Sequence, residues 1–274
     1  RVLFRSDLME ENSPDKKISD PDVTKRIEMI QKSVDRIAHQ VEDVLEFVLK
    51  KFGFSSVLHK KRILMTAGPT VEYIDPVRVV TNLSSGKTGV LLASELISAG
   101  AKVTLVYGPG TAKPPSGAKI IPVKTSKEMF DVIKNKMKKK FDLVILAAAV
   151  SDYTIEQNNH TKIKSTKKIL QIKLKQSPKI INQIKKWQKD VFLVGFKAET
   201  NISKKKLQES AMKKMKESKA DLIIANDIGT KYQKNSDFNE VIVVSSKKMV
   251  SSGWKRKENI AKFIKNEIEK SLNE

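Results

Sequence analysis

Residues 61–70, KRILMTAGPT, decide the fold of this chain. The apolar run at 63–67 has the length of one buried strand, and Gly68-Pro69 directly after it ends the strand in a turn. Apolar runs of similar length recur five times towards the C-terminus, and amphipathic segments with helical spacing separate most of them. Such an alternation is typical of a parallel sheet with helices on both faces.

The prediction is an α/β fold with a Rossmann-like, mostly parallel sheet and helices on both faces. The predicted strands are 63–67, 103–107, 120–123, 143–148, 191–196 and 222–225. The predicted helices are 86–99, 126–139, 178–187, 203–218 and 257–272. Further apolar runs at 169–174, 241–244 and 247–250 fall outside the alternation, so they predict an antiparallel addition or a flap.

A separate long helix is predicted ahead of this domain, over 22–51. Its apolar residues recur in alternating steps of three and four, as in a heptad repeat, and Gly53 stands where the helix would end. The repeat consists of Ile27, Ile30, Val34, Ile37, Val41, Val44 and Val48. One helix cannot bury this seam alone, so it should pair with another helix or chain. We predict two parts: residues 1–58, whose first six resemble a translated sequencing adapter, and the domain 59–274.

The composition excludes several classes of site. The chain has no cysteine, which excludes disulfides, thiolate metal sites and cysteine nucleophiles. It has no run of eighteen apolar residues and no recognisable signal peptide, so we expect a cytoplasmic protein without membrane spans.

Positive charge is concentrated in the α/β domain. Residues 1–58 hold ten Lys and Arg against eleven Asp and Glu, whereas residues 59–274 hold 43 against 20, a net of +23. Such a field attracts nucleotides, phosphorylated metabolites or nucleic acid. A nucleic-acid-binding protein is therefore one alternative. The lysines are spread along the chain with few aromatic residues among them, however, which favours solvated helix faces.

The candidate site lies in the loops after the strands, because ligands of open parallel sheets bind beyond the carboxyl ends of the strands. After the first strand, Gly68-Pro69-Thr70 leads through Asp75-Pro76-Val77-Arg78 to Asn82-Leu83-Ser84-Ser85-Gly86-Lys87-Thr88-Gly89. Ser84 and Ser85 are candidate N-caps of a helix whose free N–H groups suit a phosphate. A P-loop would need Gly where Thr81 stands, so that class is excluded. Alternatively, Gly86 and Gly89 only allow close packing of helix on sheet.

Three later segments have comparable positions. Ala147-Ala148-Ala149-Val150-Ser151-Asp152-Tyr153 follows another strand, where small residues admit a flat base and Asp152 either binds a base, ribose or metal, or caps a turn. In Lys162-Ile163-Lys164, two cations on one side of an extended segment suit a triphosphate, although Lys-x-Lys is more often surface charge in so basic a chain. Phe196 at the next strand end either stacks on a base or belongs to the core.

Taken in order, these blocks resemble phosphopantothenate–cysteine ligase. The shared order is Gly-Pro-Thr, Asp-Pro-Val-Arg, Asn, Ser-Ser-Gly-Lys, Ala-Ala-Ala-Val-Ser-Asp-Tyr, Lys-Ile-Lys, Gly-Phe-x-Ala-Glu-Thr and Ala-Asn-Asp, over residues 60–272. The resemblance implies activation of 4′-phosphopantothenate by CTP to an acyl-cytidylate and pyrophosphate, then attack by the amine of L-cysteine with release of CMP. It also implies Mg²⁺ with the triphosphate, and a homodimer. Neither the metal ligands nor the choice of CTP over ATP follows from the residues themselves.

The resemblance also implies roles for individual residues. Asn82, Arg78 and Lys162 match catalytic positions, with Asn82 handling the acyl-cytidylate and Lys162 facing the phosphates. Nucleotide-binding positions fall on Ala147, Ala148, Asp152, Lys162, Pro178, Lys179, Ile180, Ile181, Phe196, Lys214 and Ser218. Phosphate or substrate positions fall on Gly68, Ser84, Ser85, Gly86 and Lys87. Ser218 departs from the family, which has Lys there, and Ser177-Pro178-Lys179-Ile180 replaces Asn-Pro-Asp-Ile.

Residues 1–58 are too short for the flavin-dependent decarboxylase that often precedes this ligase. Over 33–48 their helix resembles the dimerisation and phosphoacceptor helix of sensor histidine kinases, with His39 opposite the apolar seam as the candidate acceptor. A signalling dimerisation fragment is therefore the alternative for this part. An ordinary exposed histidine on a dimerising helix is the simpler interpretation.

Overall fold

The computed structural model describes residues 21–51, 56–157, 161–166 and 168–274. The chain divides into two units, residues 1–55 and 56–274. Among the described residues, no helix combines the length and the apolar character needed to cross a bilayer.

The described residues of the first unit form a long helix, α1 (Pro21–Lys51), so the helix predicted at 22–51 is confirmed. Its seam is exposed: six side chains have between 53% and 64% of their surface accessible, namely Ile27, Ile30, Val34, Ile37, Val41 and Val44. The side chain of Val48 lies outside the described residues. A stripe of β-branched residues at heptad spacing is typical of helices that pair.

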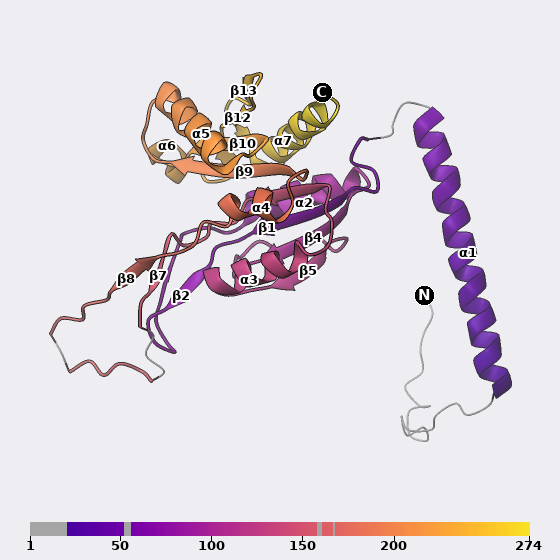
Figure 1. Ribbon diagram of the computed structural model, residues 1–274, viewed down its shortest axis with the longest axis horizontal. Coiled ribbons are helices and arrows are strands. Elements are labelled where there is room, and N and C mark those ends of the chain that lie inside the picture. Colours follow the sequence, from indigo (N-terminus) through magenta and orange to yellow (C-terminus); the bar gives the residue numbers. More distant parts are fainter. Residues whose placement is uncertain (1–20, 52–55, 158–160, 167) are drawn as a thin grey trace. The chain divides into compact units, whose positions relative to one another are not determined.

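The second unit is built on a sheet that has eight strands in the described residues (Figure 1). Across the sheet these are β13 (Met249–Ser251), β12 (Val241–Val244), β10 (Leu222–Asp227), β9 (Phe192–Glu199), β6 (Leu143–Leu146), β1 (Arg62–Ala67), β4 (Lys102–Tyr107) and β5 (Lys119–Pro122). The strands from β5 to β10 are parallel, while β12 and β13 are antiparallel. The parallel part has the doubly wound order of the Rossmann fold. The predicted α/β fold and the antiparallel addition at its end are confirmed.

Helices cover both faces of this sheet. On one face lie α2 (Lys87–Ser98) and α7 (Lys257–Leu272), and on the other α3 (Ser126–Lys136), α4 (Ile181–Trp187) and α5 (Lys204–Ser218). Each face has its own buried core. Along β1, Ile63 and Met65 belong to the first core and Leu64 to the second, because successive side chains of a strand point to opposite faces. A strand buried on both faces therefore reads as a continuous apolar run.

Several short elements were not predicted. A short helix, α6 (Thr230–Lys234), follows β10, and β11 (Phe238–Asn239) pairs with β14 (Lys255–Arg256). Two hairpins extend from the carboxyl edge of the sheet as an arm (Figure 1). They are β2 (Val71–Tyr73) with β3 (Val79–Thr81), and β7 (Tyr153–Ile155) with β8 (Leu174–Gln176), and β2 contacts β7.

The run 169–174, predicted as an antiparallel addition or a flap, belongs to the arm, and only its last residue, Leu174, lies in a strand, β8. Ile169, Leu170 and Ile172 lie in an irregular segment of the arm and are exposed. In the part of the chain that the structure describes, no second layer covers these side chains. Burial depends on a partner surface, which an apolar run by itself does not provide.

Helix α2 lies close to β1 at Gly89. A Cβ atom at this position would lie 2.6 Å from the Cβ of Ala67. We expect Gly89→Ala to lower the free energy of unfolding by about 1–3 kcal/mol, the usual cost of overpacking. Urea unfolding measures this change. The control is Ser94→Ala at an exposed site of the same helix, which should change stability by less than about 0.5 kcal/mol. Unchanged stability of Gly89→Ala would mean that α2 can move away from the sheet.

Candidate functional site

The loops after β1 and β6 lie side by side at the carboxyl edge of the sheet. The helix that follows β1 covers one face and the helix that follows β6 covers the other, so the strand order reverses between them. Beyond the strand ends, Pro69 and Ala149 form a bridge, and the Ala149 N–H donates to the carbonyl of Gly68 at 3.0 Å. The Ser151 N–H donates to Thr70 Oγ1 at 2.9 Å. Such a switch point is where open α/β sheets bind ligands.

Asn82 reaches the same point from the end of the β2–β3 hairpin. Its amide nitrogen donates to the carbonyls of Ala149 at 3.2 Å and Val150 at 3.3 Å. The hydroxyl of the preceding Thr81 donates to the carbonyl of Thr70 at 2.8 Å, which fixes the hairpin to the loop after β1. The side chain of Asn82 is exposed. The structure therefore brings Asn82 together with the loop after β6, as the predicted site requires.

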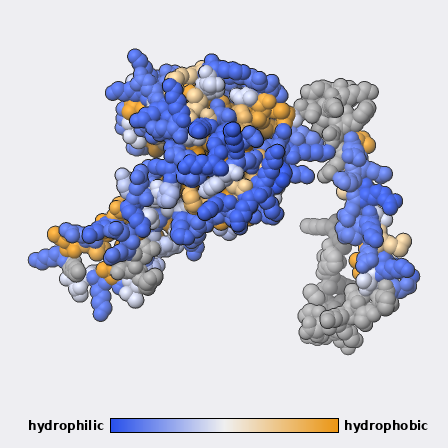
Figure 2. All heavy atoms as spheres, in the orientation of Figure 1, coloured by the Kyte–Doolittle hydropathy of each residue, from blue (hydrophilic) through white to orange (hydrophobic). Residues whose placement is uncertain are grey.

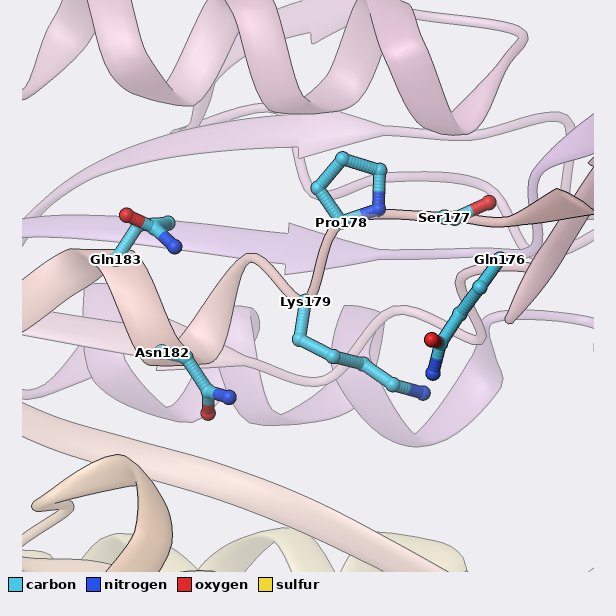
Figure 3. A pocket seen from close by; sticks show the side chains of 6 residues that line it. All are labelled: Gln176, Ser177, Pro178, Lys179, Asn182 and Gln183. Atoms are coloured by element: carbon cyan, nitrogen blue, oxygen red, sulfur yellow. The ribbon is translucent and has the colours of Figure 1, made fainter.

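A pocket of about 300 Å³ opens in the segment that leads from β8 to α4 (Figure 3). Its lining consists of Gln176, Ser177, Pro178, Lys179, Asn182 and Gln183. The Ser177 N–H donates to the carbonyl of Asp152 at 2.8 Å, and the ammonium of Lys179 forms an ion pair with the Asp152 carboxylate. Figure 3 shows the Lys179 side chain extending along the pocket towards Gln176. The pocket is thus joined to the loop after β6.

Helix α4 can lie this close to the sheet because β9 carries Gly195. A Cβ atom there would clash with the side chain of Ile181 at the start of α4. The side chains of Ile180 and Ile181 are buried in the second core and do not line the pocket. Of the predicted segment 178–181, only Pro178 and Lys179 therefore present side chains to the pocket.

Lys214 lies close to two other lysines, Lys179 and Lys197, and to Asp152. Burial lowers the pKa of Lys214 on α5, and the charges of Lys179 and Lys197 lower it further, while nearby carboxylates including Asp152 oppose this effect. Cations held this close repel one another. A bound polyanion would relieve the repulsion, so the arrangement suits phosphate groups.

Lys197 is a candidate that the sequence reasoning missed. It pairs with Glu199 at 2.9 Å, and Ser210 donates to the same carboxylate at 2.6 Å. Its neighbour Phe196 packs against the core that α2 and α7 cover. This packing agrees with the alternative that Phe196 belongs to the core. Strand alternation is the signal that could have identified Lys197, because a residue next to a core-facing Phe points to the opposite face.

Arg78 and the Lys162 segment meet through the backbone of Ile163. The Ile163 N–H donates to Asp75 Oδ2 at 3.2 Å, and the guanidinium of Arg78 donates to the Ile163 carbonyl at 3.4 Å. Lys162 is exposed beside this anchor. Two of the predicted blocks, Asp-Pro-Val-Arg and Lys-Ile-Lys, are thus in contact.

Ser218 does not suit its predicted role in nucleotide binding. The residue is 3% exposed, and its hydroxyl donates to the carbonyl of Lys214 at 2.7 Å, one turn earlier in α5. The side chain faces the interior, so the site retains Lys214 but not Ser218. Ala147 and Ala148 are half-buried after β6 and pack partly against the two cores.

The start of α2 also differs from the prediction. Its N-cap is Gly86, with a φ of 77°, so the expected cap at Ser84 or Ser85 is wrong. Glycine adopts a positive φ without strain, which explains its place here. Lys87 donates to Asp237 at 2.7 Å, and this hydrogen bond raises the pKa of Lys87. A phosphate at this helix end would have to compete with that ion pair.

Comparison with known proteins gives the family. Residues 58–272 match the DNA/pantothenate metabolism flavoprotein C-terminal domain. The coenzyme A biosynthesis bifunctional protein CoaBC of Thermococcus kodakarensis is 40% identical over 233 residues, which cover 85% of this chain and 56% of that protein. The structure of the DNA/pantothenate metabolism flavoprotein from Streptococcus pneumoniae superposes with a TM-score of 0.68 at 30% identity, covering 76% of this chain and 98% of the other.

A further solved structure, the C-terminal domain of a coenzyme A biosynthesis bifunctional protein CoaBC, superposes with a TM-score of 0.65 at 31% identity. The match covers 78% of this chain and 98% of that domain. The chain spans about half the length of the bifunctional relatives, 56% of the protein from Thermococcus kodakarensis and 53% of that from Methanocaldococcus jannaschii. The resemblance inferred from the ordered motifs is thereby confirmed, and the chain belongs to the DNA/pantothenate metabolism flavoprotein C-terminal domain family.

Proposed function

We propose that residues 56–274 join L-cysteine to 4′-phosphopantothenate at the expense of CTP, a step of coenzyme A synthesis. The observation that carries the proposal is the meeting of Asn82, the loop after β6 and lysines from several elements at one edge of the sheet. Cations there suit a leaving pyrophosphate, and an amide at the switch point suits a developing oxyanion. The name of the Thermococcus relative, a coenzyme A biosynthesis protein, supports the pathway.

The proposed reaction has two steps. The carboxylate of 4′-phosphopantothenate attacks the α-phosphorus of CTP, and the bond to the β-phosphate breaks with release of pyrophosphate. The amine of L-cysteine then attacks the acyl carbon of the cytidylate, the bond to CMP breaks, and the amine loses a proton. Lys162, Lys179 and Lys214 would neutralise the triphosphate, with Lys197 beside them. Asn82 would hold the acyl-cytidylate at the switch point.

Mg²⁺ would enter this site with the triphosphate. Among the described residues, no group of three or more His, Cys, Asp or Glu is placed to hold a metal ion. Mg²⁺ commonly keeps several waters and binds through substrate phosphates and one or two carboxylates, so the donor set here fits it. Asp152 is the carboxylate that would contribute a ligand or, alternatively, contact the cytidine. The bound ion would supply charge neutralisation of the phosphates.

We further propose that the protein is a cytoplasmic homodimer. Large apolar side chains are exposed on the arm (Figure 2), and Leu83, which follows Asn82 in the chain, is exposed as well. They include Val77, Leu83, Ile169 and Leu174. Apolar surface gathered in one region marks a protein interface, and a second copy of the chain would cover it. Sedimentation velocity measures the mass of the protein in solution, which should equal that of two chains.

A turnover assay tests the proposed reaction. With CTP, Mg²⁺, 4′-phosphopantothenate and L-cysteine, the protein is expected to release pyrophosphate and CMP in equal amounts, and omission of 4′-phosphopantothenate or chelation of Mg²⁺ should abolish the release. ATP in place of CTP should lower kcat/KM by about 100-fold if side chains read the base through hydrogen bonds. No turnover with either nucleotide, together with salt-sensitive DNA binding, would favour the nucleic-acid alternative instead.

A further inference from the structure

We propose that Asp75 and Arg78 form a clasp that positions Lys162 by holding the segment 161–166 against the β2–β3 hairpin. Neither side chain has to touch substrate for this role, so both are positioning residues. The inference rests on the proposed function, because the purpose of the clasp is the contact between Lys162 and the nucleotide phosphates.

The two carboxylate oxygens of Asp75 accept hydrogen bonds from different donors. Oδ1 accepts the N–H groups of Val77 at 2.9 Å and Arg78 at 2.8 Å, which shapes the turn of the hairpin. Oδ2 accepts the N–H of Ile163 at 3.2 Å and Nη1 of Arg78 at 2.8 Å. The residue is 1% exposed. A carboxylate buried to this degree is retained only where donors compensate its lost hydration, and this one has four.

Arg78 binds the carbonyl of Ile163, whereas Asp75 binds its N–H. Its Nη1 and Nη2 each donate to the Ile163 carbonyl at 3.4 Å, while Nη1 also bonds Asp75. One ion pair therefore holds both the N–H and the C=O of a single residue. The planar fork of the guanidinium makes this possible, and a lysine ammonium could not reproduce it.

The clasp matters because little else holds this segment. Among the described residues of the connection between β7 and β8, only Ile163 makes hydrogen bonds to other parts of the domain. Lys162 and Lys164 flank Ile163. Holding the backbone of Ile163 in place therefore also holds the Cα atoms from which both lysine side chains extend. Ordering a long side chain on binding costs free energy, and a backbone held in advance lowers that cost.

The clasp keeps its ion pair at neutral pH. Burial raises the pKa of Asp75, but the backbone hydrogen bonds from Val77, Ile163 and Arg78, with the charge of Arg78, lower it more. The net pKa lies below the ordinary value, so the carboxylate remains ionised. Its contribution to stability is therefore present at neutral pH and is lost as the pH falls through the lowered pKa.

Asp75→Asn tests the clasp with the smallest change of shape. Asparagine keeps one oxygen for the two N–H groups of the turn, but it places an NH₂ donor against Ile163 N–H and Arg78. We expect the KM for CTP to rise about tenfold and the KM for 4′-phosphopantothenate to change by less than about twofold. The amide of Ile163 should also exchange with solvent faster. Asp131→Asn, which breaks an exposed ion pair with Lys127 on α3, is the matched control and should change none of these.

A double-mutant cycle separates positioning from an independent structural role. If Asp75 acts through Lys162, Asp75→Asn should change the KM for CTP by less than about twofold when Lys162→Gln is already present. Additive effects, or an unchanged KM for CTP in the single variant, would overturn the proposal. Should Asp75→Asn fail to fold, Arg78→Lys carries the same test, because it keeps the charge but loses the fork.

Failure of the clasp and failure of the proposed function give different results. If the wild-type protein releases no pyrophosphate from CTP, the proposed function is wrong, and the role of the clasp is wrong with it. Suppose instead that the wild-type protein turns over, and that Asp75→Asn shows faster exchange at Ile163 but an unaltered KM for CTP. The role of the clasp is then wrong, and the proposed function stands.

Discussion

Lys162→Gln is expected to lower kcat/KM for CTP by about 100-fold, because a hydrogen bond between charged groups contributes about 1.5–3 kcal/mol. Glutamine keeps most of the length and the hydrogen-bonding capacity of lysine but loses its charge. The effect should therefore fall on the triphosphate, and the KM for 4′-phosphopantothenate should change by less than about twofold. Initial rates at varied CTP and at varied 4′-phosphopantothenate measure the two effects separately.

The matched control for this prediction is Lys175→Gln. Lys175 is exposed on β8 of the same arm, so its replacement changes the net charge equally. It should leave kcat/KM for CTP within about twofold of the wild type. Equal losses in the two variants would mean that the general field of the arm, and not a contact of Lys162, attracts the nucleotide. Equal losses for both substrates in Lys162→Gln would likewise argue against a phosphate contact.

Asn82→Ala is expected to slow product formation by about 100- to 1000-fold, the usual effect of removing one donor from an oxyanion site. In this role, the acyl-cytidylate would take over an N–H of Asn82 that the Ala149 or Val150 carbonyl accepts here. Binding of CTP should remain within about twofold of the wild type, because the lysine cluster is untouched. If Asn82 serves the second step, acyl-cytidylate should accumulate, and pyrophosphate should appear in a burst before CMP. Rapid-quench measurements of the two products resolve these events.

The structure suggests a second variant at this position. Asn82 donates its amide N–H to the carbonyls of Ala149 and Val150. Asn82→Asp keeps the shape but turns an oxygen towards those carbonyls, so it should lose as much activity as Asn82→Ala. Asn135→Ala at an exposed site of α3 is the control and should keep full activity. Wild-type turnover in Asn82→Ala would remove Asn82 from the site.

Most of the fold could be predicted because burial leaves a local pattern. The apolar run of β1 and the helical spacing of α2 indicate elements whose neighbours are close in the chain. Strand–helix alternation then allows few topologies, and right-handed crossovers reduce them further. The hairpins of the arm escaped prediction, because their strands have only three residues each. Several of their apolar side chains, such as Val79, Val80 and Leu174, are also exposed.

The site could be predicted in part, from the rule that ligands bind beyond strand ends. That rule identified the loops of Asn82 and Asp152, which the structure places together. It could not identify Lys197, nor could it exclude Ser218, whose hydroxyl turns inward to its own helix. The direction of a side chain at an element's end depends on packing against distant parts of the chain.

By itself, the sequence determined the fold class, the family and the order of the loops, because periodicity and motif order are properties of neighbouring residues. Only the tertiary structure decided which side chains meet. Asn82 bonds to a loop 67 residues away, and Asp75 to a backbone 88 residues away. Contacts over such separations follow from the order of strands in the sheet and the pairing of hairpins, and no local pattern encodes them.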